Sequence, residues 1–185
     1  MRRALDTLYK AALWASALCL VTIALMVGAQ LAGRLLDGAL ALLHLPRTDF
    51  VILSLAEISG YLLASASFLA LAGTLKAGAH IRVTMVLGVL GERARRLLET
   101  WAFALTTGVA GYMTWQIASF AFVSYQYGDV SAGVLPVPLW IPQSAMALGA
   151  SILTIALVDE LVTVIHYGRP TFRTAEDAIT LGKES

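Results

Sequence analysis

Charged residues are scarce in this sequence, and long hydrophobic runs take their place. Only 14% of the 185 residues are charged, whereas 58% are hydrophobic, and the mean hydropathy is +0.77. Soluble domains carry about 25% charged residues, which keep their surface in water. A chain with so few charges cannot cover a water-exposed surface of ordinary composition. The composition therefore excludes a soluble domain and indicates a protein whose solvent is a lipid bilayer.

Cysteine is nearly absent as well. The single cysteine, Cys19, lies inside an apolar block. One cysteine excludes a disulfide framework or a thiolate metal site within the chain, and we expect Cys19 to be a small packing residue. The net charge of +1 comes without a long basic run or a nucleic-acid-binding motif. Nothing in the composition therefore indicates a nucleic-acid partner.

Four apolar blocks are long enough to cross a bilayer as helices, which takes about 20 residues each. They cover approximately residues 11–33, 50–75, 101–125 and 139–165. Each block must be helical, because lipid cannot hydrogen-bond to unpaired backbone groups. The sequence predicts an all-α integral membrane protein, with one four-helix domain over residues 1–170 and a cytoplasmic tail over residues 171–185. The first block begins like a signal peptide, but its apolar stretch exceeds the usual length of about 7–15 residues, so we expect an uncleaved anchor.

Lysine and arginine are unevenly distributed among the segments outside these blocks. Eleven lie in the N-terminal tail, between the second and third blocks, or in the C-terminal tail, whereas only Arg34 and Arg47 lie between the first and second. The positive-inside rule then predicts that both termini are cytoplasmic. Trp101 and Trp140 stand at block ends, where aromatic rings favour the headgroup level. Trp115 lies within the third block, and we expect it to pack against another helix.

Two connecting segments have a helical pattern of their own. Before the third block, charged residues recur on one face, which is typical of a short amphipathic helix in the membrane interface. Arg93, Arg95 and Arg96 are its candidates for contact with anionic lipid headgroups. The alternative is that residues 92–99 simply continue the third block as a solvated helix end, and both readings stay open. After the first block, residues 35–43 share an apolar helical face that ends at Pro46, which suggests a second interfacial helix.

Residue patterns typical of an enzyme are missing from the sequence. The three histidines fall on three separate block boundaries and cannot converge on one metal under this topology. No nucleophile motif, phosphate loop or paired-carboxylate arrangement lies within the blocks. Asp159 and Glu160 are adjacent, so they point to different helix faces, and we expect them at a solvated helix end. The sequence therefore predicts neither catalysis, nor a cofactor, nor a metal site.

Glu57 is the one carboxylate deep in an apolar block, about two turns from the predicted outer end of the second span. A carboxylate there costs a few kcal/mol unless it meets water, another helix or a partner charge. A proton or ion relay would need companions that the sequence lacks, so we favour a polar contact to another helix. Small residues around Ser65 and Gly108 in the second and third blocks would let helices approach closely. This pattern indicates a scaffold rather than a conduit.

Three stretches between or next to the apolar blocks have distinctive sequences. Residues 75–83 read Leu-Lys-Ala-Gly-Ala-His-Ile-Arg-Val, residues 93–99 read Arg-Ala-Arg-Arg-Leu-Leu-Glu, and residues 136–142 read Pro-Val-Pro-Leu-Trp-Ile-Pro. With four spans and a Glu in the second, the chain resembles the small membrane subunit of TRAP transporters, the DctQ family, over nearly its whole length. Thr84 is a departure, because family members often carry Asp there.

The resemblance implies a function and partners. The chain would be the small permease subunit of a sodium-driven importer of organic acids in the bacterial inner membrane. It would brace a large multi-span permease subunit, help to dock a periplasmic substrate-binding protein, and contact membrane phospholipids. The resemblance makes Glu57, His80 and Arg82 the residues expected at the subunit interface or in a structural role, and Trp115 is a further candidate. The alternatives are a four-span scaffold of another membrane complex, a membrane enzyme or an electron carrier.

Overall fold

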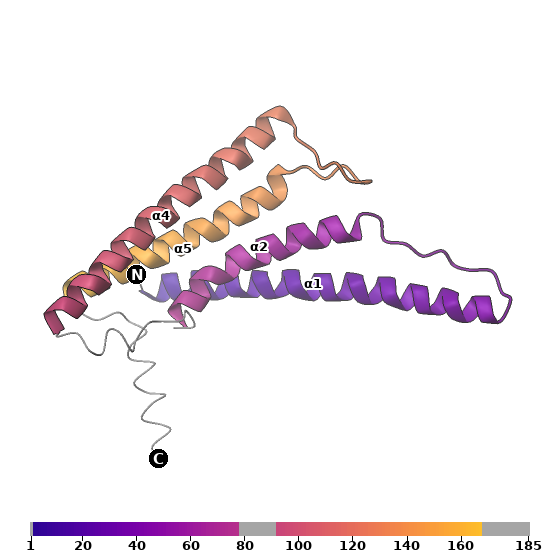
Figure 1. Cartoon of the computed structure of the whole chain (residues 1–185), viewed down its shortest axis with the longest axis horizontal. Coiled ribbons are helices and arrows are strands. Elements are labelled where there is room, and N and C mark those ends of the chain that lie inside the picture. The colour runs from indigo at the N-terminus through magenta and orange to yellow at the C-terminus, as the bar shows by residue number, and fades with distance from the viewer. Residues whose placement is uncertain (1, 78–91, 168–185) are drawn as a thin grey trace, which may run out of the picture.

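The computed structural model describes residues 2–77 and 92–167, which form four helices (Figure 1). These are α1 (Arg2–Leu42), α2 (Leu55–Lys76), α4 (Glu92–Tyr127) and α5 (Trp140–Tyr167). Apart from an isolated bridge between Val130 and Pro138, the described residues contain no β-structure. The prediction of an all-α protein is confirmed.

The helices lie in the order α1, α2, α5, α4, and successive helices along the chain run in opposite directions (Figure 1). α2 packs against both α1 and α5, whereas α4 packs extensively only against α5. One end of the bundle gathers the start of α1, the end of α2, the start of α4 and the end of α5; at the other end the pairs α1/α2 and α4/α5 diverge. The hydrophobic core is small and lies near the gathered end, around Tyr9, Ala72 and Ala156.

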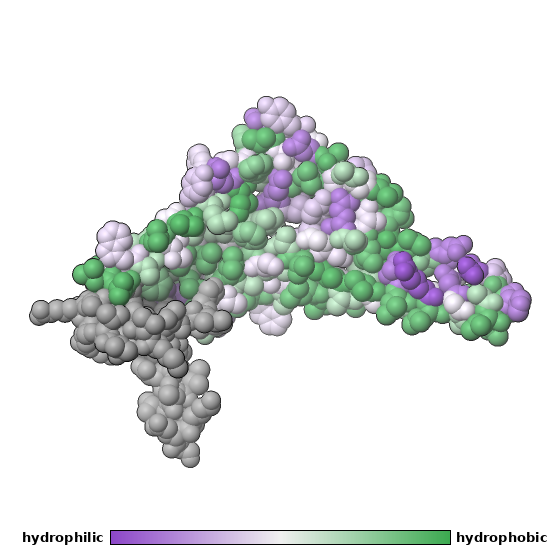
Figure 2. Space-filling model, viewed as in Figure 1, coloured by the Kyte–Doolittle hydropathy of each residue, from purple (hydrophilic) through white to green (hydrophobic). Residues whose placement is uncertain are grey.

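Many large hydrophobic side chains outside this core are exposed. Figure 2 shows hydrophobic residues over much of the drawn face. Leu25 of α1 and Leu148 of α5, for example, are 68% and 61% exposed. Three of the described helices are long and apolar enough to cross a membrane: α1, α2 and α5. α4 occupies the predicted third span and is long enough, but its hydropathy is lower than that of the other three.

The two segments expected to form short interfacial helices belong to long helices instead. Residues 34–42 continue α1 without a break, and residues 92–99 are the first two turns of α4. The prediction of separate short helices is wrong there, because most residues of both segments are Ala, Leu, Arg or Glu, which are strong helix formers, so each segment continues the neighbouring helix. Of the two readings of residues 92–99, the structure confirms the one that continues the next helix.

The second helix begins at Leu55, five residues after the start of the predicted span. Residues 43–54 are irregular, with left-handed backbone at His44, Asp49 and Ser54. Side chains of α1 hold this segment: Asp37 Oδ1 accepts hydrogen bonds from the backbone N and the hydroxyl of Thr48 at 2.7 and 2.6 Å. Gln30 Oε1 likewise accepts a bond from the Ile52 backbone N at 2.7 Å. Since the chain turns back here, the helix cannot start at Phe50.

Small residues mediate some helix contacts but not all the predicted ones. The Ser16 hydroxyl of α1 donates to the Ala66 carbonyl of α2 at 2.8 Å, and Gly149 of α5 lies directly against the α2 backbone at Phe68, where a Cβ would clash. Gly108 of α4, by contrast, has nothing within 4 Å of an added Cβ. Close approach therefore occurs between α1 and α2 and between α2 and α5, while Gly108 is left open.

Candidate functional site: a buried ion cluster and the contacts at the diverging end

Lys76, Asp159 and Glu160 form an ion cluster at the gathered end of the bundle. The Lys76 ammonium, in the last turn of α2, lies 2.7 Å from Asp159 Oδ2 and 3.0 Å from Glu160 Oε1 of α5. The Lys76 and Asp159 side chains are 21% and 24% exposed, whereas the Glu160 side chain is fully buried. Charges taken out of water require partners of opposite sign and good geometry. The Lys76 ammonium is the partner of opposite sign for both carboxylates. It thereby links α2 to α5, because Asp159 and Glu160 lie 83 and 84 positions after Lys76 in the sequence.

The sequence places Glu160 in the core through the helical repeat of α5. Ala156, Glu160 and Val164 follow one another at intervals of four, and all three are fully buried. Residues at this spacing share one helix face. The expectation that Asp159 and Glu160 form a solvated helix end is therefore wrong. The two carboxylates do leave the helix in different directions, but the Lys76 side chain is long enough to reach both from α2.

Tyr9 of α1 completes the cluster. Its ring centroid lies 5.6 Å from the Lys76 nitrogen, and the residue is only 4% exposed. A cation within about 6 Å of an aromatic face is attracted by the ring quadrupole. The Tyr9 hydroxyl is buried without a hydrogen-bond partner among the described residues. The ring face is thus the part of Tyr9 that stabilises the cluster, and through it α1, α2 and α5 meet around one ammonium group.

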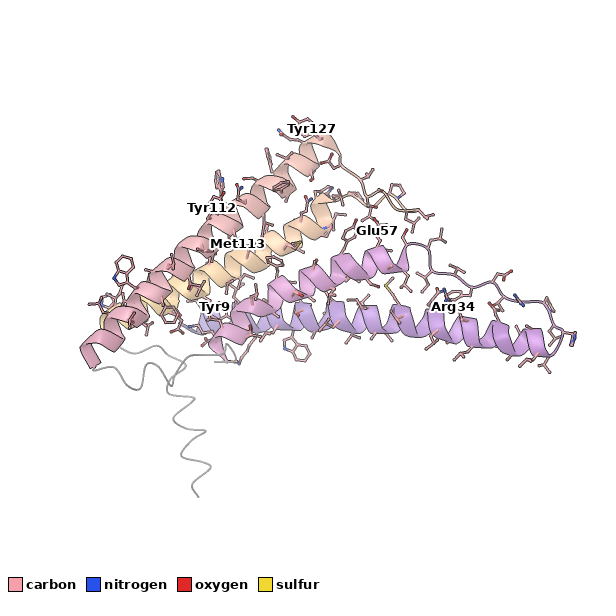
Figure 3. The ribbon with its side chains drawn as sticks, in the orientation of Figure 1. Tyr9, Arg34, Glu57, Tyr112, Met113 and Tyr127 are labelled. Atoms are coloured by element: carbon pink, nitrogen blue, oxygen red, sulfur yellow. The ribbon has the colours of Figure 1, made fainter. Side chains whose placement is uncertain are left out.

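Glu57 lies at the diverging end, in the first turn of α2 (Figure 3). The expected depth of about two turns is wrong, because the helix starts at Leu55 rather than at Phe50. Glu57 Oε1 accepts a hydrogen bond from the Tyr61 hydroxyl at 2.9 Å. Its carboxylate also lies against Gly133, in the space that a Cβ at position 133 would take, so a side chain there would push the carboxylate aside.

The segment between α4 and α5 reaches across the diverging end to α2. Beside the contact of Gly133 with Glu57, the Leu135 backbone N donates to the Ser54 hydroxyl oxygen at 3.1 Å. Within the segment, the Ser131 N bonds the Val137 carbonyl and the Leu139 N bonds the Asp129 carbonyl, at 2.9 and 3.0 Å. Pro142 follows in the first turn of α5, where its missing N–H leaves no helix hydrogen bond unmade. Glu57 therefore contacts a connecting segment of its own chain, whereas the sequence suggested another helix.

The other residues singled out from the sequence are scattered. Trp115 is 70% exposed on α4, so the described helices do not cover it, and its packing against another helix stays a prediction. Trp101 is 69% exposed, and Trp140 is 38% exposed and stands edge-on to Tyr125, with ring centroids 5.6 Å apart. Arg93, Arg95 and Arg96 belong to the first turns of α4, but their side chains lie outside the described residues. His80 and Arg82 also lie outside them.

Sequence reasoning missed the ion cluster, although a signal for it was present. Lys76 was counted only as a loop charge, yet the predicted topology already placed it on the same membrane side as Asp159 and Glu160. Opposite charges that end two spans on one side are candidates for a pair. A second missed contact joins α4 to α5, where the Thr114 and Thr154 hydroxyl oxygens lie 3.0 Å apart. Both contacts hold helices together, and within residues 2–77 and 92–167 no group of His, Cys, Asp or Glu could bind a metal ion.

Comparison with known proteins gives one result. No curated protein sequence matches the chain. The family model described as tripartite ATP-independent periplasmic transporters, DctQ component, matches residues 23–166. The matched region covers the latter part of α1, all of α2 and α4, and nearly all of α5. The chain therefore belongs to the DctQ family of transporter components.

Proposed function

We propose that this chain is the small permease subunit of a sodium-driven TRAP transporter that imports an organic acid. The family match over residues 23–166 is the observation that carries the proposal. Its partners are a large permease subunit in the same inner membrane, surrounded by phospholipids, and a periplasmic substrate-binding protein. The large subunit contains the substrate and sodium sites, and the small subunit holds it in position.

The use of polar groups in the bundle supports a scaffolding role. The buried ion cluster joins α1, α2 and α5, and the hydroxyls of Thr114 and Thr154 meet between α4 and α5. A polar group that is bonded to a neighbouring helix fixes that helix rather than lining a path for a solute. Bracing requires such a rigid bundle, which gives the large subunit a fixed surface to move against.

We further propose that all four helices cross the membrane with both termini in the cytoplasm. Successive helices alternate in direction, and eleven of the thirteen lysines and arginines belong to the N-terminal tail, the stretch between the second and third predicted spans, or the C-terminal tail. The diverging end, with residues 43–54 and 128–139, then faces the periplasm. Its exposed apolar side chains, such as Leu43 and Val134 at 68% and 75%, are suited to help dock the binding protein.

The test is co-purification followed by transport. The tagged chain is expressed with the large TRAP permease subunit of its own host and purified in mild detergent. We expect the two subunits in roughly equal amounts, and sodium-dependent uptake of an organic acid by vesicles that also receive the binding protein. A chain that purifies without the large subunit, or uptake that does not need the chain, would refute the proposal. Recovery with a different membrane complex would favour the alternative scaffold role.

A further inference from the structure

One side of α4 is covered and the opposite side is open. The covered side carries Thr107, Ala110 and Thr114 and packs against α5, the only described helix with which α4 has extensive contact. The opposite side, here called the outer face of α4, is exposed over its whole middle part. It consists of Leu105, Gly108, Tyr112, Trp115 and Gln116. Figure 3 labels Tyr112 on the side of α4 away from α5.

The outer face of α4 carries polar groups where lipid tails would surround it. Tyr112 lies about 16 Å along the helix from Trp101, roughly halfway to Tyr125. Tyr112 and Trp115 are 65% and 70% exposed, and Gln116 is exposed as well. None of the three makes a hydrogen bond within the described part of the chain. Hydrocarbon cannot supply one, so an amide, a phenol and an indole at this depth require protein or water as neighbours.

The exposed surface of α1 shows what a lipid-facing side looks like in this protein. Its middle part consists of Leu, Val, Ala and Gly, with Leu18, Val21 and Leu25 at 65%, 53% and 68% exposure. The exposed polar residue there, Thr22, bonds its hydroxyl to the Leu18 carbonyl at 2.8 Å and so presents no free donor. α1 also meets the hydropathy required of a membrane span, whereas α4 does not. The two helices therefore face different surroundings.

We propose that the outer face of α4 is the surface on which a transmembrane helix of the large permease subunit packs. This inference rests on the proposed function. The open space at Gly108 lets a helix backbone approach closely, and Gln116, Tyr112 and Trp115 offer hydrogen bonds to polar groups on that helix. The occupant is thus a membrane helix with donors and acceptors at mid-depth. Bound to it, α4 lies between two proteinaceous neighbours and no longer needs the hydropathy of a lipid-exposed span.

Site-specific photo-cross-linking tests the position of this surface. p-Benzoylphenylalanine replaces either Tyr112 on the outer face of α4 or Leu25 on the exposed side of α1, in a chain expressed with the large subunit. Illumination should join the chain to the large subunit from position 112 and not from position 25. Co-purification of the unmodified subunits is measured first, because its absence refutes the proposed function and this inference together. If the subunits co-purify, a cross-link only from position 25, only to a second copy of this chain, or to no protein at all overturns this inference alone.

Two substitutions separate contact with a partner from contact with lipid. Gly108→Phe should lower recovery of the large subunit by about fivefold, whereas Gly28→Phe, at an equally open glycine on α1, should leave it unchanged. Gln116→Leu should also lower recovery, because it removes a hydrogen bond to the partner. Lipid would favour leucine over glutamine at this position, so unchanged recovery with Gln116→Leu and a raised stability of the isolated chain would place the face in lipid and refute the inference.

Discussion

At the scale of single residues, Lys76 is the centre of the polar contacts that join α1, α2 and α5. Its ammonium contacts two carboxylates and one aromatic ring from two other helices. Removing one partner from a buried pair costs about 3–5 kcal/mol, because a charge is left without its counterpart. The partial exposure of Lys76 and Asp159 reduces this cost, since water can reach both groups. Lys76 is therefore the residue whose loss should weaken the bundle most among the exchanges of a single charge.

For Lys76→Met we expect the unfolding free energy in detergent to fall by roughly 2–4 kcal/mol. Lys10→Met is the matched control, because Lys10 is exposed and lies near the start of α1, next to Tyr9. Its effect on the unfolding free energy should stay within about 0.5 kcal/mol. Reversible unfolding followed by circular dichroism measures both. Adding Glu160→Gln to Lys76→Met should restore part of the loss. Equal stability of Lys76→Met and Lys10→Met would show that the ion cluster contributes nothing.

The ring and the hydroxyl of Tyr9 should contribute differently to stability. Tyr9→Phe keeps the ring face towards Lys76 and removes a buried hydroxyl that has no partner among the described residues. It should be neutral or raise the unfolding free energy by up to about 1 kcal/mol. Tyr9→Leu removes the ring and should lower it by about 1–3 kcal/mol through the lost cation–π contact and packing. If Phe proved as destabilising as Leu, the hydroxyl rather than the ring would matter.

Glu57 is expected to act as a hydrogen-bond acceptor. Glu57→Gln retains an oxygen for the Tyr61 hydroxyl and should change the unfolding free energy by less than about 0.5 kcal/mol. Glu57→Leu leaves the hydroxyl without its partner and should cost about 1–2 kcal/mol. The same order should appear in the amount of large subunit that co-purifies. A loss of sodium-dependent uptake with Glu57→Gln, at normal stability and recovery, would instead reveal an essential charge.

At the scale of helices, Gly149 marks the place where α5 comes closest to the backbone of α2. Gly149→Ala adds a methyl group that clashes with the α2 backbone, and we expect a loss of about 1–3 kcal/mol. Gly60→Ala provides the matched control on α2, where an added Cβ meets nothing within 4 Å. Alanine there should stabilise the helix by roughly 0.5–1 kcal/mol. A lower unfolding temperature for Gly149→Ala and a higher one for Gly60→Ala would support the contact. An unchanged unfolding temperature for Gly149→Ala would mean that the helices can separate slightly at no cost.

Hydropathy alone predicted the existence and order of the helices but not their ends. The apolar run from residue 11 to residue 33 is set by the thickness of the bilayer, whereas α1 extends to Leu42 because nothing in residues 34–42 breaks a helix. The start of α2 at Leu55 depends on hydrogen bonds from Gln30 and Asp37 to a returning chain. Such bonds depend on tertiary placement, so a linear pattern could not give them.

At the scale of the whole molecule, the site was harder to predict than the fold. Each apolar stretch of about 20 residues is long enough to cross the lipid as one helix. The number of helices can therefore be counted along the sequence. The ion cluster instead depends on the rotation of α2 and α5 about their axes, which places Lys76 opposite Glu160. The exposure of Trp115 likewise follows from which side of α4 meets α5. Helix rotation is set by packing between helices, and the hydropathy of each stretch does not determine it.

The dependence of the bundle on α5 has a consequence for biosynthesis. Of the described helices, α5 is the last to leave the ribosome, yet it is the one among them on which α4 packs extensively, and Lys76 finds both carboxylates there. With 83 residues between Lys76 and Asp159, translation at 5–20 residues per second delays their meeting by roughly 4–17 s. During that interval the nascent chain holds α1 and α2 as a pair, with α4 still lacking its main neighbour. A chain cut short before α5 would keep this unfinished state, which gives the quality-control proteases of the membrane a means to distinguish truncated from complete subunits.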